Sequence, residues 1–343
     1  MRCAEAPSTN AYTPTLSVIL PVFNEAESLP VLYHRLTQVL RNSEEGYELI
    51  FVNDGSSDRS SELLQELVEH DPRVRVVALS RNFGHQVALS AGLDHSRGRA
   101  VAIMDADLQD PPEVLLRFME QWRRGYAVVY AVRKHRKEGI LKRSAYALFY
   151  LTFKSIADIE VPLDAGDFCL LDRRVVDILV ALPEHHRFLR GLRSWVGFKQ
   201  MGIEYERDER YGGASKYSLR QLVQLALSGY IGFSLLPLRA ATWCGFFSTS
   251  VGFLLLLWVL ITRFLQSPPP HGWASTIAAI LFIGGVQLLM LGIIGEYLGR
   301  VYDEVRQRPL YIVQARLGFA VDHTRTVVRN LAKPVADEAG LKS

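Results

Sequence analysis

Two long uncharged segments near the C-terminus constrain the fold of this chain most. Residues 240–262 and 273–295 each contain about 23 residues without a charged side chain. As helices rising about 1.5 Å per residue they would span roughly 34 Å, enough for a hydrocarbon core of about 30 Å. A buried helix of a soluble protein is the alternative, but two neighbouring runs of this kind favour a pair of membrane spans. The short proline-containing connector, 263–272, predicts a helical hairpin within 237–300.

Basic residues flanking this hairpin predict its orientation. Arg239 precedes the first run, and Arg300, Arg306 and Arg308 follow the second, whereas the connector carries Arg263 alone. The excess of basic residues on the cytoplasmic side of membrane proteins therefore predicts that both termini and the N-terminal domain are cytoplasmic. Residues 1–15 contain no apolar core of signal-peptide length and are expected to be flexible, and 301–343 are expected to form a cytoplasmic tail.

Two further stretches, 141–154 and 219–236, mix aromatic and apolar residues and predict helices lying along the bilayer surface. An ordinary amphipathic core helix is an equal alternative for the first stretch.

Residues 16–218 show alternating strand and helix patterns. Short apolar runs predict five strands, at 16–20, 47–52, 74–79, 100–104 and 127–132. Helical spacing of apolar residues predicts intervening helices at 27–42, 60–70, from after Gly84 to about His95, and at 113–124. Strands separated by single crossover helices predict an α/β, Rossmann-like domain with a mostly parallel sheet.

Polar clusters follow the first four strands: Asn24-Glu25, Asp54, Arg81-Asn82 and Asp105 with Asp107. The carboxyl ends of parallel strands share one edge, where open α/β sheets bind ligands. No G-x-G-x-x-G follows the first strand and no P-loop is present, which disfavours dinucleotide binding. Two carboxylates two residues apart favour Mg²⁺ or Mn²⁺ over zinc, although an isolated Asp-x-Asp is more often a capped turn.

The net charge and the cysteine count bear on the possible partners and on the cellular compartment. The net charge of +3 gives no basis for nucleic-acid binding. Cys3, Cys169 and Cys244 are scattered and odd in number, which predicts a reducing compartment rather than a disulfide framework.

Three motifs carry a resemblance to a known family. They are Pro21-Val22-Phe23-Asn24-Glu25, Asn53-Asp54-Gly55-Ser56-Ser57-Asp58 and Asp105-Ala106-Asp107-Leu108-Gln109-Asp110-Pro111-Pro112-Glu113. They resemble family 2 glycosyltransferases of the GT-A fold, and more narrowly the polyprenyl-phosphate glycosyltransferases, a group that includes dolichol-phosphate mannose synthase. The paired spans resemble those of the bactoprenol (undecaprenyl-phosphate) glucosyltransferases. The resemblance covers roughly 16–309.

The resemblance implies roles on the donor side of the site. The nucleotide sugar would contact Pro21, Val22, Asn24, Glu25, Asp54, Arg81, Asp105 and Asp107. Asp105, Asp107 and Gln109 would hold Mg²⁺ or Mn²⁺ against the donor diphosphate. The family often has a second Asp where this chain has Asn53, which leaves Asp54 as the candidate for reading the base.

The resemblance also implies an acceptor side. Asp107 and Asp167 would be the catalytic carboxylates, with Asp167 in a Gly166-Asp167-Phe168 loop. The acceptor phosphate would contact Arg133, Arg136, Arg187, Arg190, Ser215 and Lys216. Arg187, Arg190 and Arg193 are expected close together on a helical turn, where guanidinium groups could bind a phosphate bidentately.

The implied reaction is inverting transfer of a hexose, with glucose from UDP-glucose preferred, to polyprenyl phosphate. It would take place at the cytoplasmic face of a bacterial inner membrane, in a tetramer by resemblance, and would serve O-antigen or lipopolysaccharide modification. A GDP-mannose or UDP-aminoarabinose donor is an alternative. A processive polysaccharide synthase is another, although 190–195 lacks that class's Q-x-x-R-W motif. A catalytically inactive membrane adaptor is a third.

Overall fold

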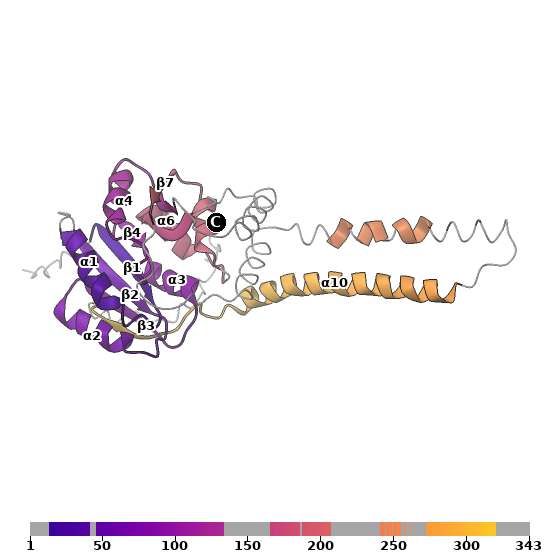
Figure 1. Ribbon diagram of the computed structural model, residues 1–343, viewed down its shortest axis with the longest axis horizontal. Coiled ribbons are helices and arrows are strands. Elements are labelled where there is room, and N and C mark those ends of the chain that lie inside the picture. The colour runs from indigo at the N-terminus through magenta and orange to yellow at the C-terminus, as the bar shows by residue number, and fades with distance from the viewer. Residues whose placement is uncertain are drawn as a thin grey trace, which may run out of the picture. The chain divides into compact units, whose positions relative to one another are not determined.

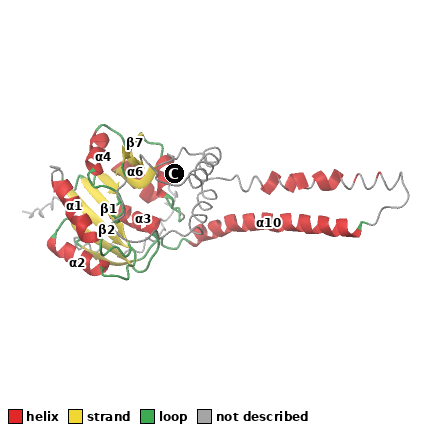
Figure 2. Ribbon diagram, viewed as in Figure 1, coloured by secondary structure: helices red, strands yellow, loops and turns green. Residues whose placement is uncertain are grey.

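The computed structural model describes most of the chain as two compact units. It describes residues 14–41, 46–133, 165–185, 187–206 and 272–319, together with 241–243, 245–248, 250–254, 257 and 261. The first unit comprises 1–143, 160–216 and 308–343, and the second comprises 144–159 and 217–307. Figures 1 and 2 show the sheet of the first unit with its covering helices and the long helix α10 of the second.

The first unit is built on an eight-stranded sheet in the order β7-β5-β6-β4-β1-β2-β3-β8. The strands are β1 (Leu16–Val22), β2 (Tyr47–Asn53), β3 (Val74–Leu79), β4 (Ala100–Ile103), β5 (Val128–Arg133), β6 (Ala165–Asp172), β7 (Gln200–Tyr205) and β8 (Val313–Leu317). Only β6 and β8 run against the direction shared by the other strands. The predicted mostly parallel α/β sheet is confirmed.

Helices cover both faces of this sheet. They are α1 (Leu29–Arg41), α2 (Ser60–His70), α3 (His85–His95), α4 (Val114–Arg123), α6 (Arg173–Ala181) and α7 (Leu189–Trp195). Apolar residues of α1, α2 and α4 share one core with alternate strand residues such as Val18 and Phe51. On the other face α3 packs closely on β1 and β2. The contact leaves no room for a side chain at Gly92, where a Cβ would lie 2.2 Å from the side chain of Ile19. The sheet is therefore the middle of three layers.

The predicted N-terminal elements agree with the structure to within about two residues. The first strand was expected to end at residue 20, yet β1 continues to Val22 with Pro21 paired to Val52. The ladder between β1 and β4 ends at Ile19 and Ile103, so Pro21 lies where one side of β1 has already lost its strand neighbour. A proline is tolerated there, as it is on an edge strand.

Three strands were not predicted. Residues 166–168, expected as a loop, belong to β6, which inserts antiparallel between β4 and β5. Residues 301–343 were expected to form a tail outside the catalytic domain, but 313–317 form β8 and pair antiparallel with β3. This correction has a physical reason: β8 covers an edge of β3 that would otherwise expose unpaired backbone groups.

The second unit contains α10 (Trp273–Arg306), which includes the second uncharged run and continues beyond its predicted end at 295. Among the described residues, one helical segment, Phe282–Arg306, is long and apolar enough to cross a membrane. The described residues of the first run, between 241 and 261, are helical. The predicted interfacial helices at 141–154 and 219–236 and most of the connector lie outside the described residues.

Candidate active site

Polar side chains from five segments meet at the carboxyl edge of the sheet. Four follow β1, β2, β3 and β4, as the sequence predicted. The fifth is the start of β6: because β6 runs antiparallel to β4, its first residues lie beside the end of β4. The last pair of that ladder, Ile103 with Cys169, lies two residues before Asp105 and two residues after Asp167. The topology thus brings Asp167 close to Asp105 and Asp107, the aspartates that were predicted to serve the acceptor and the donor.

The loops after β1 and β2 are tied to each other by side chain–backbone hydrogen bonds. Asn24 Oδ1 accepts from the backbone N–H of Ser57 at 2.8 Å, and the backbone N–H of Asn24 donates to Ser56 Oγ at 3.1 Å. Asp58 accepts from the backbone N–H groups of Ala26 and Ser60, so it ties the loop after β1 to the start of α2. Asn24 itself is left-handed, with φ 56°. The predicted nucleotide contact of Asn24 therefore sits on a loop that Asn24 also shapes.

Asp54 fastens the loop that leads into α3. Its two carboxylate oxygens accept from the backbone N–H groups of Phe83 at 2.7 Å and Gly84 at 3.0 Å, and only 3% of the residue is exposed. Burial raises the pKa of this carboxyl, and the two backbone hydrogen bonds oppose that rise. A Cβ at Gly55 would lie 2.6 Å from the backbone of Arg81, so the two loops also pack tightly. Recognition of the nucleotide base by Asp54 stays a prediction. In the structure Asp54 also holds the loop between β3 and α3 in place.

The Asp105–Glu113 segment holds its three candidate metal ligands, Asp105, Asp107 and Gln109, in a constrained turn. Asp107 Oδ1 accepts from the backbone N–H of Gln109 at 3.1 Å, and the intervening Leu108 is left-handed with φ 61°. A buried bond from Tyr205 Oη to Asp110 Oδ1, at 2.6 Å, anchors the turn to β7. A left-handed backbone conformation is strained for a residue other than glycine, and such strained residues are concentrated at functional sites.

The two carboxylates at this turn could supply only part of the coordination shell of a metal ion. The Asp105 side chain is 31% exposed, whereas Asp107 is buried. Within the described part of the chain, no three or more His, Cys, Asp or Glu side chains are grouped so that they could hold a metal by themselves. A metal held here would need further oxygen ligands from substrate or water.

Asp167, which was predicted to face the acceptor, is the centre of a second polar cluster. Arg190 Nη2 lies 3.3 Å from its Oδ1, while Gln86 Nε2 donates to its Oδ2 at 3.3 Å. His85 Nε2 lies 3.5 Å from Asp167 Oδ2 and 3.7 Å from Asp105 Oδ1, so this imidazole stands between the two aspartates.

Mutual pairing shifts the pKa values of this cluster. Burial alone would raise the pKa of Asp167, but the charge of Arg190 and the hydrogen bond from His85 hold it well below its usual range. For His85, burial lowers the pKa, whereas Asp167 and Asp105 raise it more strongly, to about 9. At neutral pH the cluster therefore contains a carboxylate flanked by an imidazolium and a guanidinium.

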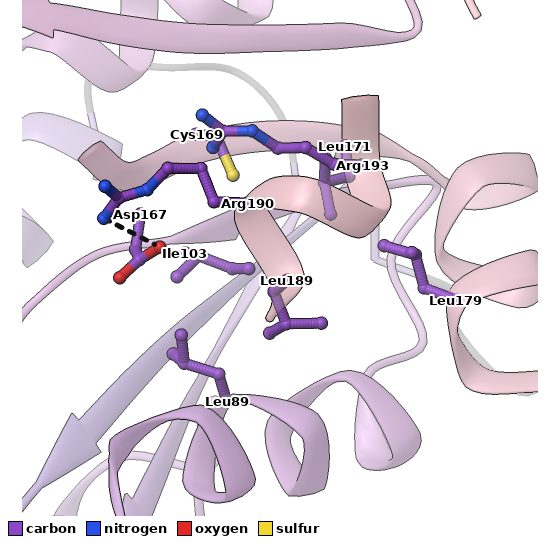
Figure 3. Close-up of a pocket in the computed structure, with 9 residues that line it drawn as sticks. All are labelled: Leu89, Ile103, Asp167, Cys169, Leu171, Leu179, Leu189, Arg190 and Arg193. Atoms are coloured by element: carbon purple, nitrogen blue, oxygen red, sulfur yellow. Dashed lines mark ion pairs between the residues drawn. The ribbon is translucent and has the colours of Figure 1, made fainter. Parts of the chain in front are cut away.

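The three arginines expected on one helical turn are separated by the fold. Arg190 and Arg193 both lie on α7, and Figure 3 shows Arg190 pointing to Asp167 and Arg193 lying beside Cys169. Arg193 is 2% exposed and its guanidinium carbon lies 5.2 Å from the centre of the Tyr130 ring. Arg187 precedes α7 and donates to the backbone carbonyls of Leu182 at 2.7 Å and Glu184 at 3.2 Å. The expectation of a shared helical turn is thus wrong for Arg187.

The remaining predicted residues are placed as follows. Pro21 and Val22 end β1, and the backbone N–H of Glu25 donates to Ser60 Oγ. Arg81 is exposed and stacks over the Phe83 ring at 4.0 Å. Arg133 is the last residue of β5. Arg136, Ser215 and Lys216 lie outside the described residues.

His85 and Gln86 contact the candidate site residues, although the sequence did not single them out. Both lie in the first turn of α3, directly after the polar cluster that follows β3. Both residues directly follow the polar cluster after β3 and Gly84, whose φ is positive. This position in the sequence could have indicated that they lie near the site.

The comparisons with known proteins agree with this architecture. Residues 17–179 match the glycosyl transferase family 2 model, and the chain belongs to that family. Residues 236–301 match a second model, the GtrB C-terminal hairpin. The family resemblance drawn from the three motifs and the paired uncharged runs is confirmed.

Relatives align over most of the chain. A glycosyltransferase of Bacillus subtilis, YkcC, is 48% identical over 88% of this chain and 94% of its own length. The bactoprenol glucosyl transferase of Shigella phage SfX is 40% identical over 88% of this chain and 99% of its own length. Among solved structures, mannosyl-3-phosphoglycerate synthase from Rubrobacter xylanophilus is 17% identical, covering 75% of this chain and 78% of that one, with a TM-score of 0.45.

Proposed function

We propose that this chain transfers glucose from UDP-glucose to the phosphate of a polyprenyl phosphate, with inversion at the anomeric carbon. One observation carries the proposal: Asp105 and Asp107 share an edge of the sheet with the Asp167–Arg190 pair, in a chain 40% identical to a bactoprenol glucosyl transferase. A metal-binding carboxylate pair suits a nucleoside diphosphate, and an arginine suits an anionic acceptor.

The chemistry of the carboxylate pair fits Mg²⁺ or Mn²⁺. Magnesium commonly takes one or two protein carboxylates and completes its shell with substrate phosphates and water. Asp105 and Asp107 would be those ligands, and the Gln109 backbone N–H would keep Asp107 in position. When bound, the metal would neutralise the charge that grows on the departing nucleoside diphosphate. The predicted ligand role of the Gln109 side chain remains part of this proposal.

Asp167 would position groups rather than remove a proton. The acceptor phosphate is already anionic at neutral pH, so it needs little general-base help. The lowered pKa of Asp167 also makes it a weak base. Its carboxylate instead orients Arg190, whose buried Nε has no hydrogen-bond partner among the described residues. An acceptor phosphate would satisfy that group.

The membrane segments supply the setting for a lipid acceptor. The match of 236–301 to a hairpin family and the apolar length of Phe282–Arg306 support membrane association. We propose a multi-pass protein of a bacterial inner membrane with its catalytic domain and both termini in the cytoplasm. Assembly as a tetramer is a further part of the proposal.

The metal assignment is tested by Asp107→Ala, with Asp177→Ala as the matched control. Asp177 lies on α6 with a 65% exposed side chain, away from the carboxyl edge. Transfer of radiolabelled glucose from UDP-glucose to undecaprenyl phosphate should require Mg²⁺ or Mn²⁺ and fall at least about a hundredfold in Asp107→Ala. Asp177→Ala should retain wild-type turnover. Full turnover by a folded Asp107→Ala protein would contradict the metal assignment.

A further inference from the structure

Gln86 joins three elements through one side chain. In the first turn of α3, its Nε2 donates to Asp167 Oδ2 on β6 at 3.3 Å. Its Oε1 accepts from the backbone N–H of Leu189, the first residue of α7, at 3.1 Å. The next residue of α7 is Arg190, which pairs with the other oxygen of Asp167. Gln86, Asp167 and Arg190 therefore form a closed ring of contacts.

The contact with Leu189 replaces a helix cap. The first N–H groups of a helix lack partners inside the helix and are usually satisfied by a capping side chain. Phe188 stands at the N-cap of α7 and offers no such side-chain oxygen. Gln86 supplies the missing acceptor from another helix, and in doing so it fixes where α7 begins.

Only a side chain that both donates and accepts can fill this place. Asp167 is a carboxylate and needs a donor, whereas the Leu189 N–H needs an acceptor. A primary amide offers both at once, while glutamate only accepts and lysine only donates. The reversed amide would set its oxygen against the Asp167 carboxylate, so the two partners also determine the amide orientation.

We propose that Gln86 is a positioning residue that holds Asp167 and Arg190 together as one acceptor-binding unit. The inference rests on the proposed function, because it assigns the lipid phosphate to Arg190. It differs from a general structural role in one respect: losing Gln86 should impair the acceptor side and spare the donor side. Asp107 is held by the backbone N–H of Gln109, and within the described residues the side chain of Gln86 forms its hydrogen bonds with Asp167 and Leu189 rather than with Asp105 or Asp107.

The test compares full-length Gln86→Leu and Gln86→Glu with Gln65→Leu, which makes the same change on an exposed face of α2. Gln86→Leu should raise the KM for undecaprenyl phosphate about tenfold and leave the KM for UDP-glucose within about twofold. Gln86→Glu should raise the acceptor KM at least as much, because it places a second carboxylate against Asp167. Gln65→Leu should behave as wild type.

Hydrogen–deuterium exchange gives a readout that does not depend on activity. The backbone N–H of Leu189 should exchange faster in Gln86→Leu, but should stay protected in Gln86→Glu, which keeps the acceptor oxygen. Equal rises in both KM values, or unchanged exchange at Leu189 in Gln86→Leu, would overturn the proposal. If the wild-type protein transfers no glucose, the proposed function fails, and the exchange experiment still decides whether Gln86 holds the start of α7.

Discussion

Glu48 and Asp167 are both largely buried carboxylates paired with an arginine, yet they lie at opposite ends of the sheet. Glu48, near the amino end of β2, accepts from Ser17 Oγ and from the Arg97 backbone N–H at 2.8 Å, and lies 2.6 Å from Arg75 Nη1. Asp167 has its contacts with Arg190, Gln86 and His85 at 3.3 to 3.5 Å. The exposed fraction of the side chain is 3% for Glu48 and 15% for Asp167.

We call a carboxylate closed when short contacts surround it, as for Glu48, and open when its contacts are longer and it is more exposed, as for Asp167. The short contacts of Glu48 fix β1, β2, β3 and the segment before β4, and leave no room for a ligand. The longer contacts of Asp167 resemble those of catalytic groups without substrate, which tighten only when substrate binds. The same pairing of acid and arginine therefore stabilises the fold at one edge and, in the proposed function, prepares a binding site at the other.

The largest effect is expected for Glu48→Ala. Removing one partner of a buried ion pair leaves Arg75 without its countercharge and should cost about 3 to 5 kcal/mol of unfolding free energy. Denaturant unfolding followed by tryptophan fluorescence measures this loss. Glu62→Ala, at an exposed pair with Arg59, should change stability by no more than about 0.5 kcal/mol. Transfer activity of folded Glu48→Ala protein should match wild type, and a selective loss of activity would erase the contrast.

Asp167→Asn should show the opposite pattern. The amide keeps the size of the side chain but loses the charge that orients Arg190, so glucose transfer should fall about a hundredfold. The unfolding free energy should fall less than in Glu48→Ala, because the contacts of Asp167 with Arg190, Gln86 and His85, at 3.3 to 3.5 Å, are longer than those of Glu48. If this variant lost as much stability as Glu48→Ala while its folded fraction stayed active, Asp167 would be a closed carboxylate as well.

Asp71 provides a smaller, pH-dependent test of what a closed carboxylate contributes. It accepts from Tyr33 Oη at 2.8 Å and from Arg73 Nη2 at 2.8 Å. Burial opposes ionisation, but the bonds from Arg73 and Tyr33 win and lower the pKa of Asp71. Because the folded-state pKa lies below the unfolded value of about 3.9, the stabilisation is present above that pH and disappears as pH falls through the folded pKa.

Asp71→Asn should therefore cost about 1 to 2 kcal/mol at pH 7. The difference from wild type should shrink below about pH 4. Denaturant unfolding at several pH values checks this, and a difference that does not change with pH would contradict the assignment.

The gathering of the polar clusters after β1 to β4 was predictable from sequence, because each apolar strand pattern ends in a polar cluster and parallel strands share one edge. That rule was enough to place Asp105 and Asp107 at this edge. The acceptor side was less accessible. Asp167 lies on a strand that pairs Cys169 with Ile103, and no local pattern reveals such a distant antiparallel pairing.

The local sequence could not predict which residues contact both Asp167 and other parts of the site. His85 and Gln86 look like ordinary polar residues at the start of a helix, and their partners on β6 and α7 are distant in sequence. Likewise, β8 follows a long apolar helix and gains its strand conformation by pairing with the edge of β3. Both features depend on tertiary packing rather than on periodicity.

The central claim is that the carboxyl edge transfers a single sugar to a lipid phosphate. Its most direct test is mass spectrometry of lipid extracted after incubating the purified full-length protein with UDP-glucose, Mg²⁺ and undecaprenyl phosphate. We predict that the lipid phosphate gains the mass of one anhydrohexose, and that the product is absent with Asp107→Ala. An unmodified lipid accompanied by free glucose, or by a soluble glucose polymer, would contradict transfer to the lipid phosphate.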